Sequence, residues 1–307
     1  MRSLNIVFMG SPEFAIPSLD LIHQSRHNIS AVVSNPDKRR GRRGKPVPTD
    51  VKKRALELGL PVIDAADVRS DSFEKQIAGL NPDLLVVVAF KILPVNILKI
   101  PEIGSINLHA SLLPKFRGAA PIHWAIINGE KETGATVFFL DESVDTGKII
   151  GQQRTAIGPM ETTGDVYERL KREGAGLLLS CIDDIAEGET TEKTQEDSLA
   201  TPAPKLYREN THIDFRKSAS EVHNIVRGLN PFPGAWCMYG DEKMNIHKTV
   251  PHSDKSGRPG ELKRDGDKLF AGCGTGSVEI IELQLPGKPR ISGSDFVNGY
   301  DLSRPLR

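Results

Sequence analysis

The sequence predicts an α/β fold: a doubly wound, mostly parallel, Rossmann-like sheet followed by a smaller, OB-like β-barrel domain. Short apolar runs alternate with helix-like segments throughout the first half of the chain. One of these runs, residues 84–90 (LLVVVAF), is apolar on both faces, as a central parallel strand would be. After Asn210 the pattern changes to short strands of alternating polarity separated by glycines, which indicates a β-rich barrel.

The elements of the first half follow in chain order. We expect strands at residues 4–9, 29–33, 84–90, 105–108 and 136–140. The turn Gly10-Ser11-Pro12 leads into a helix that begins near Glu13, and residues 49–58 place charged side chains over an apolar stripe. Residues 163–187 predict one long amphipathic helix with Thr163 as its N-cap.

A polar stretch that ends in prolines separates the two predicted domains. Residues 189–205 have the composition of a linker that lies over a surface. We therefore predict an N-terminal domain at residues 1–188 and a C-terminal barrel at residues 206–307. The barrel region opens with a helix at residues 220–229, followed by a corner rich in proline and glycine (NPFPGAW).

Composition excludes several classes of protein. The chain has 40 basic and 40 acidic residues, so only a local basic patch could bind a polyanion. Cys181, Cys237 and Cys273 lie far apart without a Cys-x-x-Cys pair, which indicates neither a disulfide framework nor a cysteine zinc site. The N-terminal apolar run is too short for a signal peptide, and no run is long enough to span a bilayer. We expect a cytoplasmic protein.

Signals for a bound dinucleotide or metal are weak. The turn at Gly10 supplies one glycine where a Rossmann fingerprint needs three, and strands flank the glycines at residues 272–276 where a strand and a helix are needed. His23 and His27 have metal-like spacing on a predicted helix, but no third ligand suggests itself. We expect both histidines at the surface, and no metal.

The densest polar cluster begins at Asn107. Asn107 and His109 alternate with apolar residues, so on a strand they share one face with Cα atoms about 6.5 Å apart. Both side chains can then converge on a substrate carbonyl at the end of the sheet, where open α/β folds bind ligands. The alternative is an asparagine and a histidine satisfied at a strand end beside a buried loop, and composition alone does not decide between the two.

An acidic segment, residues 141–147, follows the last predicted strand of the sheet. A buried aspartate beside a histidine can orient the imidazole and increase its basicity. The alternative is an acidic turn that solvates a strand end. Spacing alone does not select Asp145 over Asp141 or Glu142.

A basic run without acidic residues follows the second predicted strand. Its glycines predict a loop in place of a regular element, and this loop should lie on the ligand-binding side of the sheet. There it could follow phosphates and give salt-dependent binding, whereas the alternative is a solvated loop. Its basic members are Lys38, Arg39, Arg40, Arg42, Arg43 and Lys45.

Taken together, these motifs resemble the folate-dependent formyltransferase family. The resemblance is carried by Asn107-x-His109, by SLLPKFRGAAPIHWAI after it, and by Asp145-Thr146-Gly147. The segments VFMGSPEFAIPSL, NPDKRRGRRGK and KLYRENTHIDF extend it along the whole chain. It implies a catalytic domain at residues 1–188, in which Asn107, His109 and Asp145 carry out formyl transfer without a metal. It also implies 10-formyltetrahydrofolate as the formyl donor, bound by Ser111, Leu112, Leu113 and Pro114.

The resemblance further implies the acceptor, which is the amino group of methionine on initiator tRNA. The basic run, with Arg42 as the best single residue, and the domain at residues 206–307 would bind that tRNA. Residues 205–208 (KLYR) either dock the two domains or extend the tRNA surface. We expect a monomer.

Two positions depart from the family pattern, because Lys91 and Ser143 stand where a glycine is common. Both are expected near the pterin. Three other functions remain open: formylation of a nucleotide-linked amino sugar, hydrolysis of 10-formyltetrahydrofolate, and non-catalytic binding of tRNA or folate. The first two would keep the same catalytic residues, whereas binding alone gives no reason to keep them together.

Overall fold

The computed structural model describes residues 2–39, 44–254 and 257–307. Its residues cluster into two compact units. Unit 1 comprises Met1–Gly118, Gly134–Thr155 and Tyr167–Pro202, and unit 2 comprises Ala119–Thr133, Ala156–Val166 and Ala203–Arg307. Packing therefore groups two segments from the predicted N-terminal domain with the C-terminal residues. The functional division at residues 188 and 206 remains a prediction.

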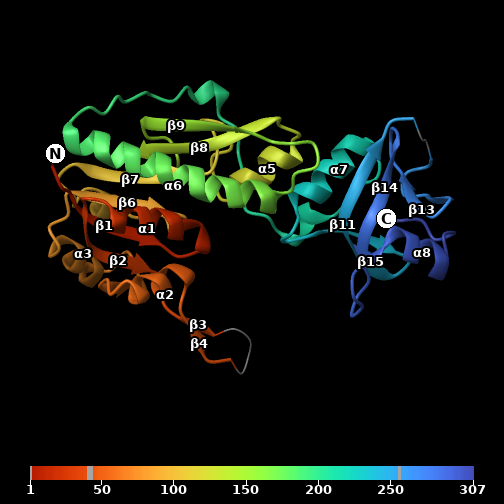
Figure 1. Cartoon of the computed structure of the whole chain (residues 1–307), viewed down its shortest axis with the longest axis horizontal. Helices are drawn as coiled ribbons and strands as arrows, with labels where there is room; N and C mark the ends of the chain where they lie inside the picture. The colour runs from red at the N-terminus through yellow and green to blue at the C-terminus, as the bar shows by residue number, and fades with distance from the viewer. Residues whose placement is uncertain (1, 40–43, 255–256) are drawn as a thin grey trace. The chain divides into compact units, whose positions relative to one another are not determined.

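Unit 1 is built on a seven-stranded sheet in the order β5-β2-β1-β6-β7-β8-β9 (Figure 1). The strands are β1 (Asn5–Gly10), β2 (Asn28–Ser34), β5 (Val62–Asp64), β6 (Leu84–Val88), β7 (Gly104–His109), β8 (Glu132–Phe139) and β9 (Ile149–Ala156). The first five strands of this order are parallel, and β8 pairs antiparallel with β7. This topology confirms the predicted doubly wound, mostly parallel sheet.

Helices cover both faces of this sheet. They are η1 (Glu13–Ala15), α1 (Ile16–Gln24), α2 (Asp50–Glu57), α3 (Asp71–Ala78), α4 (Val95–Leu98) and α6 (Thr163–Glu187). Phe73 and Ile77 of α3 pack in one apolar core with the β6 side chains Leu85 and Val87. The opposite face carries α6, because a Cβ atom added at Gly174 would lie 3.2 Å from the Leu108 side chain.

The start of α6 differs from the prediction in its capping residue. The Thr162 hydroxyl accepts a hydrogen bond from the Asp165 N–H, and the Asp165 carboxylate accepts from the Thr162 N–H. This reciprocal pair is a capping box. The hydroxyl of Thr163, the predicted cap, instead donates to the Gly228 carbonyl. The correct N-cap is therefore Thr162.

One of the two histidines expected at the surface is buried. His23 is exposed at the end of α1, but His27 lies beyond that helix. The His27 Nδ1 accepts a hydrogen bond from the Leu4 N–H, and its Nε2 contacts Asp183 Oδ1 at 3.2 Å. These partners compensate its burial, so the surface prediction is wrong for His27.

Unit 2 contains an antiparallel sheet in the order β10-β11-β14-β13-β12, with β15 beside β14. Its elements are α5 (Pro121–Ile127), η3 (Arg208–Thr211), α7 (Ala219–Gly228), β10 (Ala235–Tyr239), β11 (Glu242–His252), β12 (Leu262–Asp265), β13 (Lys268–Gly272), β14 (Ser277–Gln284), β15 (Ile291–Ser292) and α8 (Gly293–Gly299). Arg307 and Met238 exchange both backbone hydrogen bonds, and the Leu306 N–H donates to the Gly260 carbonyl. Residues 306–307 thus bridge the two edges of the sheet, as a barrel requires.

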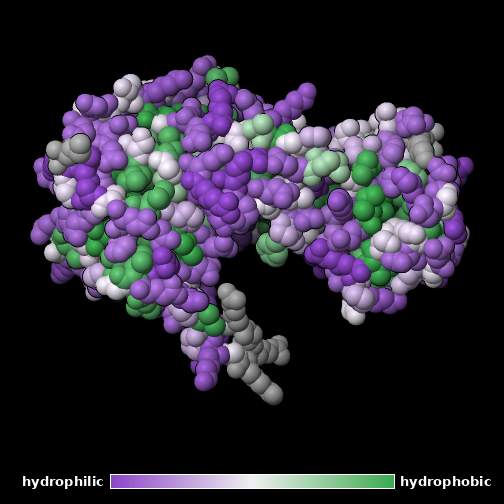
Figure 2. All heavy atoms as spheres, in the orientation of Figure 1, coloured by the Kyte–Doolittle hydropathy of each residue, from purple (hydrophilic) through white to green (hydrophobic). Residues whose placement is uncertain are grey.

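On the face drawn in Figure 2, hydrophilic side chains predominate and the apolar ones are scattered. The most exposed large apolar residues are Ile92 and Phe232. Among the helices of the described residues, none combines the length and apolar character needed to cross a bilayer.

Candidate active site

Asn107 and His109 lie at the carboxyl end of β7, between β6 and β8. Their neighbour Leu108 faces α6, so both side chains point to the opposite face of the sheet. His109 is buried, with 6% of its surface exposed, whereas Asn107 is half-buried. Within the part of the chain that the structure describes, the Asn107 amide makes no side-chain hydrogen bond, and this leaves it free to bind a ligand.

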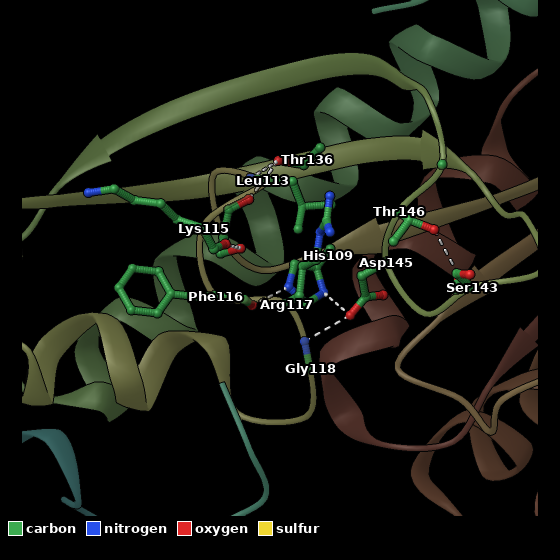
Figure 3. Close-up of polar contacts among 12 residues, drawn as sticks. His109, Leu113, Lys115, Phe116, Arg117, Gly118, Thr136, Ser143, Asp145 and Thr146 are labelled. Carbon is green, nitrogen blue, oxygen red and sulfur yellow. Dashed lines mark hydrogen bonds and ion pairs between the residues drawn. The ribbon is translucent and has the colours of Figure 1, made fainter. Parts of the chain in front are cut away.

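The orientation of the His109 ring is fixed by a backbone carbonyl. His109 Nε2 lies 2.8 Å from the Phe116 oxygen, and a carbonyl can only accept, so Nε2 carries the proton (Figure 3). In the neutral ring Nδ1 then has a free lone pair. Nδ1 faces Asp145 Oδ2 at 3.9 Å, which is too long for a hydrogen bond. The Phe116 carbonyl, in place of Asp145, therefore sets the tautomer.

The Asp145 carboxylate is held by a backbone N–H group. Its Oδ2 accepts a hydrogen bond of 2.8 Å from the Gly118 N–H (Figure 3). Asp145 and Phe116 both have left-handed backbone conformations, with φ angles of 57° and 62°. Such conformations cost non-glycine residues on the order of 1–3 kcal/mol and persist only where the surroundings fix them. The contacts that place Asp145 beside His109 thus also balance local strain.

The predicted folate loop, residues 111–114, is tied to β8 and β9. The Thr136 hydroxyl accepts from the Leu113 N–H and donates to the Ser111 carbonyl (Figure 3). The Gln152 amide of β9 donates to both the Leu113 carbonyl and the Thr136 hydroxyl. These backbone groups of the loop are therefore already hydrogen-bonded within the protein.

The side chains of the same loop divide into two kinds. Ser111 and Leu113 are buried, and Leu113 packs with Phe138 and Ile149. Leu112 and Pro114 keep part of their surface exposed. A ligand of this loop would therefore touch Leu112 and Pro114, while Ser111 and Leu113 set its shape.

A cavity of about 470 Å³ opens at the carboxyl edge of the sheet. Its lining follows the ends of β1, β2 and β6, and comprises Ser11, Pro12, Asn35, Pro36, Lys38, Val47, Pro48, Thr49, Asp50, Ala89, Phe90 and Lys91. Ala89 comes directly after the Val88–Leu108 pair, so the cavity borders the end of β7 next to His109. The size and place match ligand sites of open α/β sheets.

The two positions that depart from the family pattern are accommodated without strain. Lys91 lines the cavity and donates a hydrogen bond to the Ala65 carbonyl. Ser143 is exposed, and its carbonyl accepts from the Thr146 hydroxyl. Neither residue has a left-handed backbone, so neither position requires glycine for its conformation.

The basic run begins in regular structure, which corrects the loop prediction at Lys38 and Arg39, whereas Lys45 precedes the partner strand and is in no regular element. Lys38–Arg39 (β3) pairs antiparallel with Pro46–Val47 (β4). Lys38, Arg39 and Lys45 are exposed, and Lys38 also lines the cavity. Positive charge therefore stands at the rim of the site. Arg40, Arg42 and Arg43 lie outside the described residues.

Sequence reasoning missed the groups that hold the site together. Phe116 and Gly118 act through backbone atoms, and these leave no signal in residue type. Thr136 and Gln152 are ordinary polar residues on strands. Gln195 lies in the predicted linker, where a polar residue is expected in any case, yet it contacts the backbone of Asp145.

Comparison with known proteins finds similarity over almost the entire chain. The profile described as "Formyl transferase" matches residues 2–182, and the profile described as "Formyl transferase, C-terminal domain" matches residues 205–301. The chain belongs to the formyl transferase family. Curated relatives named methionyl-tRNA formyltransferase include those of Citrifermentans bemidjiense (43% identical over 98% of this chain and 95% of the relative) and Geobacter metallireducens (42% identical, 100% and 99%).

Solved structures of formyl transferases share the fold. A sugar 3N-formyl transferase, WlaRD, solved in the presence of dTDP and 5-N-formyl-THF, matches with a TM-score of 0.70 at 20% identity, covering 94% of this chain and 100% of that one. An N-formyltransferase from Helicobacter canadensis, in complex with folinic acid and dTDP-3-aminofucose, also has a TM-score of 0.70 at 20% identity, covering 90% and 98%.

Proposed function

We propose that this protein transfers the formyl group of 10-formyltetrahydrofolate to the amino group of methionyl initiator tRNA and thereby supports translation initiation. One observation carries the proposal: relatives named methionyl-tRNA formyltransferase are 42–43% identical over almost the entire chain, including both family regions. The sugar formyl transferases share only 20% identity, so they support the fold more than the acceptor.

Asn107 stabilises the transition state in this mechanism. When the amine nitrogen attacks the formyl carbon, a C–N bond forms and negative charge develops on the formyl oxygen. The Asn107 amide has no other side-chain partner among the described residues, so it can donate a hydrogen bond to that oxygen. A donor of this kind typically contributes about 3–4 kcal/mol to transition-state stabilisation.

His109 and Asp145 handle the proton. Nε2 of His109 is occupied by the Phe116 carbonyl, so Nδ1 accepts the proton that the attacking amine loses. The Asp145 carboxylate, 3.9 Å away, stabilises the imidazolium that forms. As the bond from the formyl carbon to the folate N10 breaks, this proton passes to N10, and tetrahydrofolate leaves. Acid–base groups of this kind contribute roughly 10²- to 10⁴-fold in rate.

The two substrates would lie at the carboxyl edge of the sheet. The exposed surfaces of Leu112 and Pro114 contact the folate, while Ser111 and Leu113 shape the loop. The basic run, which includes Lys38, Arg39 and Lys45, follows the phosphates of the tRNA, with the barrel domain at residues 206–307 as a second tRNA-binding surface. The reaction requires no metal, and we propose that the protein acts as a monomer.

Formyl transfer from labelled 10-formyltetrahydrofolate tests the proposal, with methionyl initiator tRNA, free methionine and a nucleotide-linked amino sugar as parallel acceptors. We expect product on the tRNA alone. Product on the sugar would overturn the acceptor but keep the chemistry, whereas formate without any acceptor would indicate a hydrolase. Binding of folate and tRNA without any product would indicate a non-catalytic binding protein.

A further inference from the structure

Most of the segment predicted as a linker, residues 189–202, belongs to unit 1, which also contains Asn107, His109 and Asp145. We call residues 193–202 the strap; it belongs to unit 1 and runs back along β9 after α6 (Figure 1). Lys193 exchanges both backbone hydrogen bonds with Ile149 of β9. At the other end of the strap, the Thr201 carbonyl accepts a hydrogen bond from the Arg117 N–H. The strap is therefore anchored at both ends beside residues of the active site.

Gln195 connects the strap to Asp145. Only 8% of its surface is exposed, and both the nitrogen and the oxygen of its amide are hydrogen-bonded. The Nε2 group donates to the carbonyls of Asp145 and Gly147, at 3.0 and 2.8 Å. The Oε1 atom accepts from two guanidinium nitrogens of Arg117, at 3.2 and 2.8 Å. One buried side chain thus holds the backbone of Asp145 and the chain next to Phe116 at a fixed separation.

Thr201 connects the strap to His109. Its hydroxyl accepts a hydrogen bond of 2.9 Å from the Phe116 N–H. The carbonyl of the same Phe116 accepts from His109 Nε2. Because Phe116 has a left-handed backbone, its peptide groups keep their direction only while such contacts hold them. Thr201 therefore acts on His109 through one intervening residue.

We propose that Gln195 and Thr201 are positioning residues for formyl transfer: Gln195 sets the place of Asp145, and Thr201 sets the orientation of the His109 ring. This inference rests on the proposed function, because it assigns the proton to His109 and the stabilising charge to Asp145. Neither strap residue touches a reacting atom. Their effect is on kcat, since small misplacements of a catalytic group can cost about 100-fold in rate.

A double-mutant cycle tests the role of Gln195. We expect Gln195→Leu to lower kcat about 10- to 100-fold with little change in the KM of either substrate. In an Asp145→Asn background the same substitution should cost less than about threefold, because a residue that acts through Asp145 has nothing left to position. Equal decreases in both backgrounds would overturn the inference. Ser198→Ala is the matched control, because Ser198 is an exposed residue of the same strap whose hydroxyl donates to Glu196.

Thr201 gives an independent test that does not disturb a buried amide. Thr201→Val keeps the shape but removes the acceptor of the Phe116 N–H, and we expect kcat to fall about tenfold. Thr201→Ser keeps the hydroxyl and should retain wild-type kcat within about twofold. Equal activity of the two variants would contradict the inference, even if Gln195→Leu failed to fold.

The strap inference and the proposed function can be tested separately. The proton transfer is common to every amine acceptor, so each comparison is made with the acceptor that the wild-type protein uses. Product on an amino sugar would change the acceptor and leave the strap comparisons decisive. Wild-type transfer to tRNA with unaltered kcat in Gln195→Leu and Thr201→Val would overturn the strap inference alone.

Discussion

At the scale of single residues, the roles in the site follow from which polar atoms already have a hydrogen-bond partner. The Phe116 carbonyl holds one nitrogen of His109, whereas the amide of Asn107 has no side-chain partner among the described residues. A half-buried amide without a partner forgoes hydrogen bonds that a ligand can supply. Because of this contrast, we assign proton transfer to His109 and stabilisation of the oxyanion to Asn107.

Removing the Asn107 amide should therefore reduce turnover without unfolding the protein. We expect Asn107→Ala to lower kcat about 10²- to 10³-fold, because one oxyanion donor is removed. Steady-state kinetics with both substrates and a thermal melt would measure this. The matched control is Asn96→Ala, which removes an exposed asparagine whose amide contacts Glu74. Retention of wild-type kcat in Asn107→Ala would exclude the proposed oxyanion contact.

At the scale of elements, the loop at residues 111–114 takes its shape from β8. Thr136 contacts the backbone of this loop twice and is buried. Thr133, on the same strand, is also buried, but its hydroxyl has no hydrogen-bond partner among the described residues. Two threonines on one strand thus differ in role, which a sequence pattern does not show.

These two threonines give a matched pair of valine substitutions. Thr136→Val leaves buried partners on Leu113 and Ser111 unsatisfied, so we expect the free energy of unfolding to fall by about 1–3 kcal/mol and the KM for the folate to rise. Thr133→Val removes an unsatisfied hydroxyl and should be neutral or slightly stabilising. Denaturant unfolding and folate kinetics check both. Equal effects of the two substitutions would show that the contacts of Thr136 are not what shapes the loop.

The basic run is the second element with a testable role. Replacing Arg39, Arg40, Arg42 and Arg43 with glutamine should raise the KM for tRNA while folate binding stays the same. The logarithm of kcat/KM should also depend less steeply on the logarithm of salt concentration, with a slope smaller by about 0.7–0.9 for each phosphate that is no longer bound. Glutamine at Lys53, Lys75, Lys99 and Arg172, all exposed on unit 1, is the charge-matched control. An unchanged salt dependence in the arginine variant would make the run a solvated surface.

At the scale of the whole molecule, unit 2 contains three histidines with lowered pKa values. Burial lowers the pKa values of His123, His223 and His247, all of which belong to unit 2. For His223 the nearby Arg227 cation lowers the pKa further. The neutral ring of His223 is well paired, with Nε2 donating to the Pro159 carbonyl and Nδ1 near the Thr249 hydroxyl. Unit 2 thus favours neutral histidines.

Unit 2 should therefore lose stability in mild acid. Because the folded pKa of each histidine lies below its unfolded value of about 6.5, the unfolded state binds more protons as the pH falls. The contribution of these histidines to the free energy of unfolding is fully present above about pH 6.5. Below that pH it decreases by up to about 1.4 kcal/mol per pH unit for each histidine kept neutral. Thermal melts from pH 7.5 to 5 would measure this, and His223→Gln should reduce the slope. A melting temperature that does not change over this range would contradict the prediction.

The sequence by itself determined the fold class, most element positions and the identity of the family. Apolar runs and their periods depend on residue type alone, so the strands β1, β6 and β7 and the extent of α6 were predictable. Asn107 and His109 were also predictable as a pair, because a strand has a period of two. The pattern did not select Asp145 among three acidic residues, and only the family resemblance did so.

Only the tertiary structure decided how these groups are held. The contacts that fix His109 and Asp145 come from the Phe116 carbonyl, the Gly118 N–H and the side chains of Gln195 and Thr201. Backbone atoms have the same chemistry at every position, and Gln195 lies 50 residues from Asp145 along the chain. A polar residue in a linker gives the same sequence pattern whether it faces solvent or, like Gln195, is hydrogen-bonded to the backbone of a catalytic residue. Its role follows from the path of the chain in space, which local composition does not contain.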